Sequence, residues 1–123
     1  MSFDPALAGE DYCYLTTTGR VTGRPHTIEI WFGLEGGTLY MLSGGGRRSD
    51  WVKNLVRSPE VEVRIAGETR PGRARVVDGE DEDERARRLL FEKYSERYSG
   101  DLANWRATAL PVAVDVGGSA DIG

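Results

Sequence analysis

Short segments typical of β-strands, separated by glycine turns, occupy much of the sequence. In the stretch 27–32, Ile28, Ile30 and Phe32 alternate with threonine, glutamate and tryptophan, and a period of two indicates a strand with one buried face. Two adjacent glycines connect this stretch to the apolar segment 39–42. Because glycine accepts the positive φ angles of a tight hairpin, the pattern predicts an antiparallel pair of strands.

Four further segments have the alternating, β-branched or aromatic composition of strands. They are 12–18, 61–65, 73–77 and 109–116. Pro71 predicts an edge or a bulge near the start of the third. Apolar residues at helical spacing predict a short helix over 49–57 and a longer one over 82–98, ended by Gly100, and a short turn is expected at 101–105. About six antiparallel strands with two helices predict a mainly β (α+β) fold, a small antiparallel barrel with helices packed on it.

The length of 123 residues predicts one domain that can bury a core without disulfides. The core is expected over about 12–116, with a loose arm or short helix at 1–10 and a loose tail at 117–123. No apolar run approaches the roughly 20 residues that span a bilayer. The first residues also lack the basic and apolar regions of a secretory signal, so a cytoplasmic protein is expected.

The chain has one cysteine and one histidine. It therefore cannot form an internal disulfide, and a histidine-rich metal site is not expected. Cys13 lies in an apolar strand segment, which favours a buried, unreactive thiol over a nucleophile. The formal net charge of −4 argues against general nucleic-acid binding, although the basic residues are unevenly placed.

Two polar loops carry the residues best suited to bind an anion. The first, 16–25, contains Arg20 and Arg24 between glycines, and the second, 43–50, has three glycines followed by two arginines at the start of the predicted short helix. Arginine presents a planar, permanently charged fork to phosphate. Glycine amides and a helix N-terminus add further attraction for negative charge. Together the loops predict a site for a phosphorylated cofactor, although solvated charges on flexible connections would produce the same pattern.

Several motifs, taken in this order, resemble the deazaflavin-dependent nitroreductase family. This family belongs to a wider split β-barrel group that includes flavoproteins similar to pyridoxamine phosphate oxidase. The matching motifs are Thr-Thr-Thr-Gly-Arg-x-Thr-Gly-Arg-Pro at 16–25, Ile-Trp-Phe at 30–32, Gly-Gly at 36–37, Ser-Gly-Gly-Gly at 43–46 and Trp-Val-Lys-Asn-Leu at 51–55, which leads into Ser-Pro-Glu-Val at 58–61.

The resemblance implies a six-stranded split barrel, similar to FMN-binding split barrels. It also implies that reduced coenzyme F-420, a deazaflavin with a phosphorylated tail, donates hydride to a small electron-poor or conjugated acceptor such as a nitroaromatic, quinone or enone. Because such a cofactor makes the bonds itself, no catalytic side chain is expected from the protein. The resemblance further implies a homodimer in which each cleft borrows residues from its neighbour.

By motif position, the resemblance assigns cofactor binding to Arg20, Thr22, Arg24, His26, Ser43, Gly44, Gly45, Gly46, Arg47, Trp51 and Asn54. It also suggests Trp31 and Tyr98 for the substrate pocket, whereas Tyr94 is expected to pack in the core or in a dimer interface. From spacing alone, Trp51 could equally anchor its helix, Asn54 could lie on the helix surface, and His26 could be structural. The chain has Val21 where relatives often carry a second basic residue, so Arg24, Arg47 and Arg48 would have to compensate.

Two other functions remain open from the sequence. An FMN-binding split-barrel oxidoreductase would use the same basic loops for a single phosphate. A non-enzymatic barrel that carries a cofactor or a lipid would bind without turnover.

Overall fold

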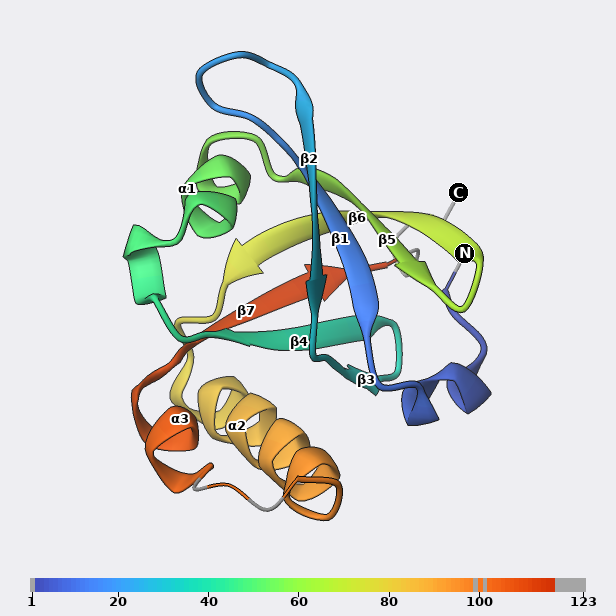
Figure 1. Cartoon of the computed structure of the whole chain (residues 1–123), viewed down its shortest axis with the longest axis vertical. Helices are drawn as coiled ribbons and strands as arrows, with labels where there is room; N and C mark the ends of the chain where they lie inside the picture. The colour runs from blue at the N-terminus through green and yellow to red at the C-terminus, as the bar shows by residue number, and fades with distance from the viewer. Residues whose placement is uncertain (1, 99, 101, 117–123) are drawn as a thin grey trace.

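The computed structural model describes residues 2–98, 100 and 102–116 as a curled antiparallel sheet with helices against it (Figure 1). Within these residues the strands are β1 (Cys13–Thr18), β2 (Pro25–Ile30), β3 (Gly33–Glu35), β4 (Thr38–Ser43), β5 (Glu60–Ile65), β6 (Glu68–Val76) and β7 (Leu110–Asp115). The helices are α1 (Asp50–Arg57), α2 (Glu80–Ser95) and α3 (Ala103–Thr108), and the 3-10 turns are η1 (Pro5–Gly9) and η2 (Gly46–Arg48).

The order of the strands explains why the sheet closes on itself. Neighbours follow β2-β1-β5-β6-β7-β4-β3, and each pair is antiparallel. The two edge strands, β2 and β3, follow one another in the chain with only Trp31 and Phe32 between them. The sheet must therefore curl until its edges approach, which confirms the expected mainly β split barrel.

The described chain has seven strands rather than the six expected, because the predicted strand 27–32 ends at Ile30 and a further short strand, β3, follows it at Gly33–Glu35. The expected hairpin between 27–32 and 39–42 is therefore wrong: β2 pairs with β1 as far as Ile30, and the hairpin partner of β4 is β3. Trp31 and Phe32 carry the chain from one sheet edge to the other. The backbone N–H of Phe32 donates to Tyr94 Oη at 3.0 Å, so a side chain of α2 satisfies a buried group that no strand pairs.

The helices follow the predictions with shifted ends. Helix α1 begins at Asp50, and α2 spans 80–95 rather than 82–98, starting with four acidic residues that suit its N-terminal dipole. The short turn expected at 101–105 corresponds to α3, which begins at Ala103. Pro71 lies in the part of β6 that pairs with β5 alone, since pairing with β7 starts at Arg73, which agrees with the expected sheet edge.

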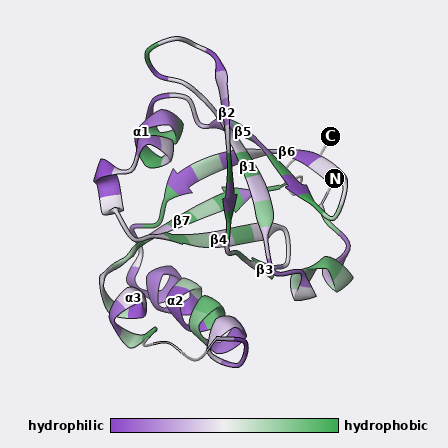
Figure 2. Cartoon of the chain, in the orientation of Figure 1, coloured by the Kyte–Doolittle hydropathy of each residue, from purple (hydrophilic) through white to green (hydrophobic). Residues whose placement is uncertain are grey.

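The core has two parts, one inside the barrel and one between the sheet and helices α2 and α3. Figure 2 shows β4 and β7 as mostly hydrophobic and η2 as hydrophilic. Phe3 is 4% exposed in the barrel cluster, so the arm that carries η1 is held against the fold. Cys13 is fully buried, as expected, and burial raises the pKa of its thiol to about 12. The expected loose tail at 117–123 lies outside the described residues.

Candidate functional site

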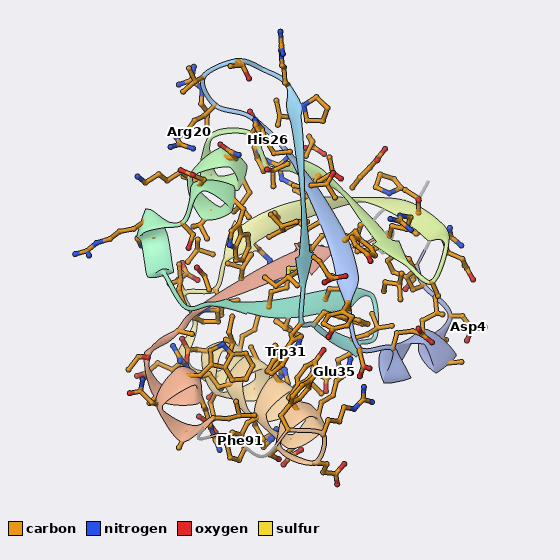
Figure 3. The ribbon with its side chains drawn as sticks, viewed as in Figure 1. Asp4, Arg20, His26, Trp31, Glu35 and Phe91 are labelled. Carbon is orange, nitrogen blue, oxygen red and sulfur yellow. The ribbon has the colours of Figure 1, made fainter. Side chains whose placement is uncertain are left out.

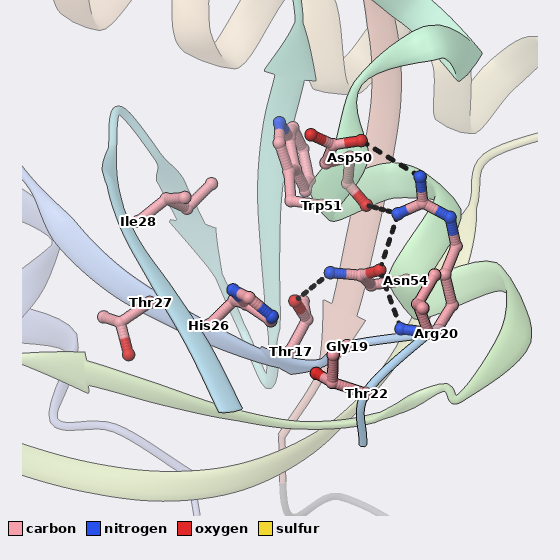
Figure 4. A pocket seen from close by; sticks show the side chains of 11 residues that line it. Thr17, Gly19, Arg20, Thr22, His26, Thr27, Ile28, Asp50, Trp51 and Asn54 are labelled. Carbon is pink, nitrogen blue, oxygen red and sulfur yellow. Dashed lines mark hydrogen bonds and ion pairs between the residues drawn. The ribbon is translucent and has the colours of Figure 1, made fainter. Parts of the chain in front are cut away.

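A pocket of about 480 Å³ lies between the β1–β2 loop, strand β2 and helix α1 (Figure 4). This volume is within the range of roughly 300–1,000 Å³ that is usual for small-molecule sites. It is lined by Thr17, Gly19, Arg20, Val21, Thr22, His26, Thr27, Ile28, Asp50, Trp51 and Asn54. We call it the α1 pocket.

Glycines give the β1–β2 loop its shape beside the pocket. The Gly19 N–H donates to the Arg24 carbonyl at 2.7 Å, and the Gly23 N–H donates to the Gly19 carbonyl at 2.9 Å. Gly23 has a φ of +75°, which other residues rarely adopt. A Cβ on Gly19 would lie 2.7 Å from His26 Nε2, so only glycine lets the imidazole pack this closely against the loop.

Asn54 of α1 links the loop to the barrel. Its Oδ1 accepts a hydrogen bond from the Arg20 backbone N–H at 3.2 Å and another from Arg20 Nη1 at 2.9 Å. Its Nδ2 donates to Thr17 Oγ1 on β1 at 3.2 Å. Asn54 is 4% exposed and Thr17 is 1% exposed, so this amide is a buried connector and not a helix-surface residue. The arginine is therefore presented by a rigid support.

Asp50 contributes the one carboxylate of the α1 pocket. Its Oδ1 lies 3.1 Å from Arg20 Nη2, and its backbone carbonyl accepts from Arg20 Nη1 at 3.4 Å. The Arg20 side chain is 31% exposed and that of Asp50 is 84% exposed. Water screens such a pair, so its contribution to stability is at most about 1 kcal/mol.

Five of the residues expected to bind a cofactor line this pocket together: Arg20, Thr22, His26, Trp51 and Asn54. Arg20 and His26 come from opposite arms of the β1–β2 connection and lie at the same end of the molecule (Figure 3). The sequence interpretation missed the carboxylate of Asp50, the first residue of α1. It also missed Thr27 and Ile28. Their position on β2 directly after His26 could have indicated that they lie beside the same pocket.

Of the second loop only Asp50 lines the α1 pocket, and the polar groups of 43–49 bond to one another. Ser43 Oγ donates to the Gly46 carbonyl at 3.1 Å and lies 2.8 Å from Ser49 Oγ. A Cβ on Gly45 would meet Ser49 Oγ at 2.5 Å, so glycine keeps this turn compact. Gly44 is exposed in the same turn. The second loop thus acts on the pocket indirectly, by placing the first turn of α1.

The remaining predicted residues lie elsewhere. Arg24 is exposed at the end of the first loop, outside the pocket lining, and Arg47 lines a hollow with Val56 on another side of α1. Trp31 stacks on Tyr94 with ring centroids 4.2 Å apart and lies 4.6 Å from the Tyr98 ring. This aromatic cluster lies against α2, away from Arg20 and His26 (Figure 3). Tyr94 itself is fully buried, as expected of a core residue.

Two absences apply to the described part of the chain. Within it, no group of three or more histidine, cysteine, aspartate or glutamate residues is arranged to hold a metal ion. None of its helices has both the length and the apolar character required to traverse a bilayer.

Comparison with known proteins identifies the family. A model of the F420H(2)-dependent quinone reductase family matches residues 4–117. The chain belongs to this family. Membership confirms the resemblance inferred from the motifs and makes the chain an oxidoreductase of a deazaflavin-dependent class.

Solved structures confirm the fold of this F420H(2)-dependent quinone reductase family member. An F420-H2 dependent reductase is 22% identical, with a TM-score of 0.69, over 85% of this chain and 94% of that chain. A putative pyridoxamine 5'-phosphate oxidase from Listeria innocua is 20% identical, with a TM-score of 0.66, over 89% and 86% of the two chains. A structure described as a domain-swapped dimer is 24% identical, with a TM-score of 0.69, over 85% and 80%.

Proposed function

We propose that this chain transfers hydride from reduced coenzyme F-420 to a small electron-poor or conjugated acceptor, such as a quinone, nitroaromatic or enone. The observation that carries the proposal is the α1 pocket, in which Asn54 holds Arg20 at the lining of a site of ligand size. Membership of a family defined by F420H(2) supports the choice of cofactor.

The lining fits a ligand with both an anionic part and a flat ring system. The Arg20 guanidinium and the Thr22 hydroxyl are hydrogen-bond donors for phosphate oxygens. Trp51 and Ile28 add apolar surface to the lining of the same pocket. The chemistry of this donor set therefore suits a phosphorylated deazaflavin, with Arg20, Thr22 and His26 toward the anionic part and Trp51 toward the ring.

The charge around the pocket fits the same cofactor. Segments 19–28 and 44–59 contain six arginine or lysine residues and one acidic residue, in a protein whose formal net charge is −4. Five of the six basic residues form no ion pair among the described residues: Arg24, Arg47, Arg48, Lys53 and Arg57. A local charge of this sign attracts an anionic ligand and increases its rate of association. We assign Arg24 and the amides of 43–46 to the part of the cofactor that extends out of the pocket, and Arg47 and Arg48 to its long-range attraction.

Coenzyme F-420, when bound, supplies the hydride and the redox chemistry. The protein must bind the cofactor, fix its orientation and keep water from its reactive face. Asn54 performs the orienting role by holding Arg20, and the Trp51 side chain, which packs against the barrel core, performs the shielding role. None of these tasks requires a protein acid, base or nucleophile.

We also propose a homodimer. Trp31 and Tyr98, which the resemblance suggests for the acceptor site, lie away from the α1 pocket of their own chain. A second subunit could bring its aromatic cluster to this pocket, and Tyr98 is 37% exposed. The relative described as a domain-swapped dimer supports such an exchange of parts. Light scattering at micromolar concentration is expected to give twice the chain mass, and a monomeric mass would contradict the proposal.

A titration with two cofactors tests the function. Oxidised coenzyme F-420 and FMN are added separately while ligand fluorescence is followed, and reduced coenzyme F-420 is then mixed with a quinone. Micromolar binding of coenzyme F-420, and its oxidation only when the quinone is present, are expected. Tighter binding of FMN, with a yellow purified protein, would favour the FMN alternative. Binding without turnover on a panel of acceptors would favour a carrier, and binding of neither cofactor would exclude the oxidoreductase site proposed here.

A further inference from the structure

The guanidinium that faces the α1 pocket already has an anionic partner. Arg20 Nη2 lies 3.1 Å from Asp50 Oδ1, and this carboxylate is the one hydrogen-bond acceptor that the described residues give to that nitrogen. The carboxylate of Asp50 also lines the pocket. The Asp50 carboxylate therefore occupies the position from which an anionic ligand would bind the Arg20 guanidinium.

Arg20 does not need Asp50 to stay in place. Its Nη1 is bonded to Asn54 Oδ1 at 2.9 Å, its backbone N–H is bonded to the same oxygen, and Asn54 is itself fixed by Thr17. These contacts are buried or partly buried. The contact of Asp50 is exposed, since 84% of its side chain is accessible to water. Asn54 thus positions Arg20, whereas Asp50 neutralises its charge, and both residues belong to α1.

Asp50 also opposes the charge of its surroundings. It is the only acidic residue in segments 19–28 and 44–59, which otherwise carry six cations. Its carboxylate is on the first residue of α1, where the helix dipole attracts negative charge and would also attract that of a ligand. A ligand anion that binds Arg20 must displace this carboxylate or share the arginine with it.

We propose that Asp50 is a specificity-determining residue that competes with the anionic group of the cofactor for Arg20. The inference rests on the proposed function, because it concerns the same pocket. In the empty site the carboxylate neutralises Arg20 and weakens capture of small anions. A ligand that contacts the pocket at several points compensates for this competition, whereas a simple anion does not. Asp50 thus lowers affinity in general and favours ligands that also fill the apolar side of the pocket.

Substitution of Asp50 tests the competition directly. The dissociation constant of oxidised coenzyme F-420 is measured by fluorescence titration for the wild type, Asp50→Asn, Asp50→Glu and the control Asp81→Asn. Asp81 is also exposed and also lies in the first turn of a helix, but in α2, so this control removes one charge far from the pocket. Thermal unfolding of each variant establishes that it is folded.

Asp50→Asn is expected to bind coenzyme F-420 about three- to tenfold more tightly than the wild type at low salt, with a smaller gain at high salt because exposed charges are screened. Asp50→Glu and Asp81→Asn are expected to stay within about twofold of the wild type. A titration with inorganic phosphate, monitored by tryptophan fluorescence, is expected to show a larger relative gain for Asp50→Asn than coenzyme F-420 shows.

Each other result has a defined meaning. If the wild type binds coenzyme F-420 and Asp50→Asn binds it equally or less tightly, Asp50 positions Arg20 and the inference is overturned while the proposed function stands. An equal gain in affinity in Asp81→Asn would show that the effect comes from the net charge of the protein, and would also overturn the inference. If neither the wild type nor Asp50→Asn binds, the proposed function and the inference both fail.

Discussion

At the residue scale, we expect cofactor binding to depend most on Arg20. Its contacts with Asn54 fix the guanidinium before any ligand arrives, so little side-chain entropy is lost on binding. Arg20→Ala is expected to weaken binding of coenzyme F-420 by about 1–3 kcal/mol, as for the loss of a charge-assisted hydrogen bond. Fluorescence titration measures this change. Arg88→Ala, an exposed arginine of α2, is the matched control, and an unchanged affinity in Arg20→Ala would remove the residue from the site.

The residues of the α1 pocket differ in how far the sequence could predict them. Arg20 and Asn54 were each predicted from motifs, but their contact joins positions 34 residues apart and depends on how α1 docks on β1. Asp50 was not predicted, because its significance lies in a contact with Arg20 that forms only when the chain folds. Local patterns identify side chains that suit a ligand. Tertiary packing decides which of them meet.

At the element scale, the crossing at 31–32 was the main difference from the predicted strands. The alternation of Ile28, Ile30 and Phe32 continues through the break, because the burial of Phe32 follows the same period as the strand before it. Sequence periodicity reports burial, not pairing, so it could not show that the chain changes sheet edges after Ile30. The contact that holds this crossing comes from Tyr94 on α2, 62 residues later.

Tyr94→Phe tests how much this contact stabilises the barrel. The variant keeps the ring that stacks on Trp31 but removes the hydroxyl that accepts from the Phe32 N–H and donates to the Asp11 carbonyl at 2.8 Å. Because a buried N–H is left unsatisfied, the free energy of unfolding is expected to fall by about 1–3 kcal/mol. Urea unfolding measures the change. Tyr98→Phe, whose hydroxyl is exposed, is expected to change stability by less than about 0.5 kcal/mol, and equal losses in both variants would contradict the explanation.

Helix α2 is attached to the sheet by a charged contact that makes stability depend on pH. Arg75 of β6 binds both carboxylate oxygens of Glu82 at 2.7 and 2.8 Å, and the Tyr40 hydroxyl of β4 donates to the same group at 2.7 Å. Hydrogen bonding from Arg75 is the main cause that lowers the pKa of Glu82 from 4.5 to about 2. A depressed folded-state pKa means that this stabilisation is fully present above about pH 4.5 and is lost as pH falls toward 2.

Glu82→Gln is therefore expected to reduce stability at neutral pH by about 2 kcal/mol and to flatten the fall in stability between about pH 4.5 and 2. Urea unfolding at a series of pH values measures both effects. Glu80→Gln, in the same first turn but without an ion pair among the described residues, is the control. A wild-type slope retained in Glu82→Gln would show that other carboxylates dominate acid unfolding.

At the scale of the whole molecule, charge is divided between two ends. The end formed by the β1–β2 loop, η2 and α1 is basic, whereas α2 begins with four acidic residues at the other (Figure 1). The net charge of −4, which argued only against general nucleic-acid binding, hides this division. The basic end contains the α1 pocket, so long-range attraction directs an anion to the site where Arg20 is held.

This division predicts that distant arginines contribute to binding through the electric field and not through contact. Arg47 and Arg48 are exposed, lie outside the α1 pocket and form no ion pair among the described residues. The affinity of the wild type for coenzyme F-420 is expected to fall about tenfold between about 20 and 200 mM salt, as screening shortens the reach of the field. The double variant Arg47→Gln/Arg48→Gln should bind about three- to tenfold more weakly at low salt, approach the wild type at high salt and have a shallower salt dependence.

Arg64→Gln/Arg88→Gln, which removes two exposed arginines from other elements, controls for net charge. A loss in the Arg47/Arg48 variant that persists undiminished at high salt would mean direct contact with the cofactor instead.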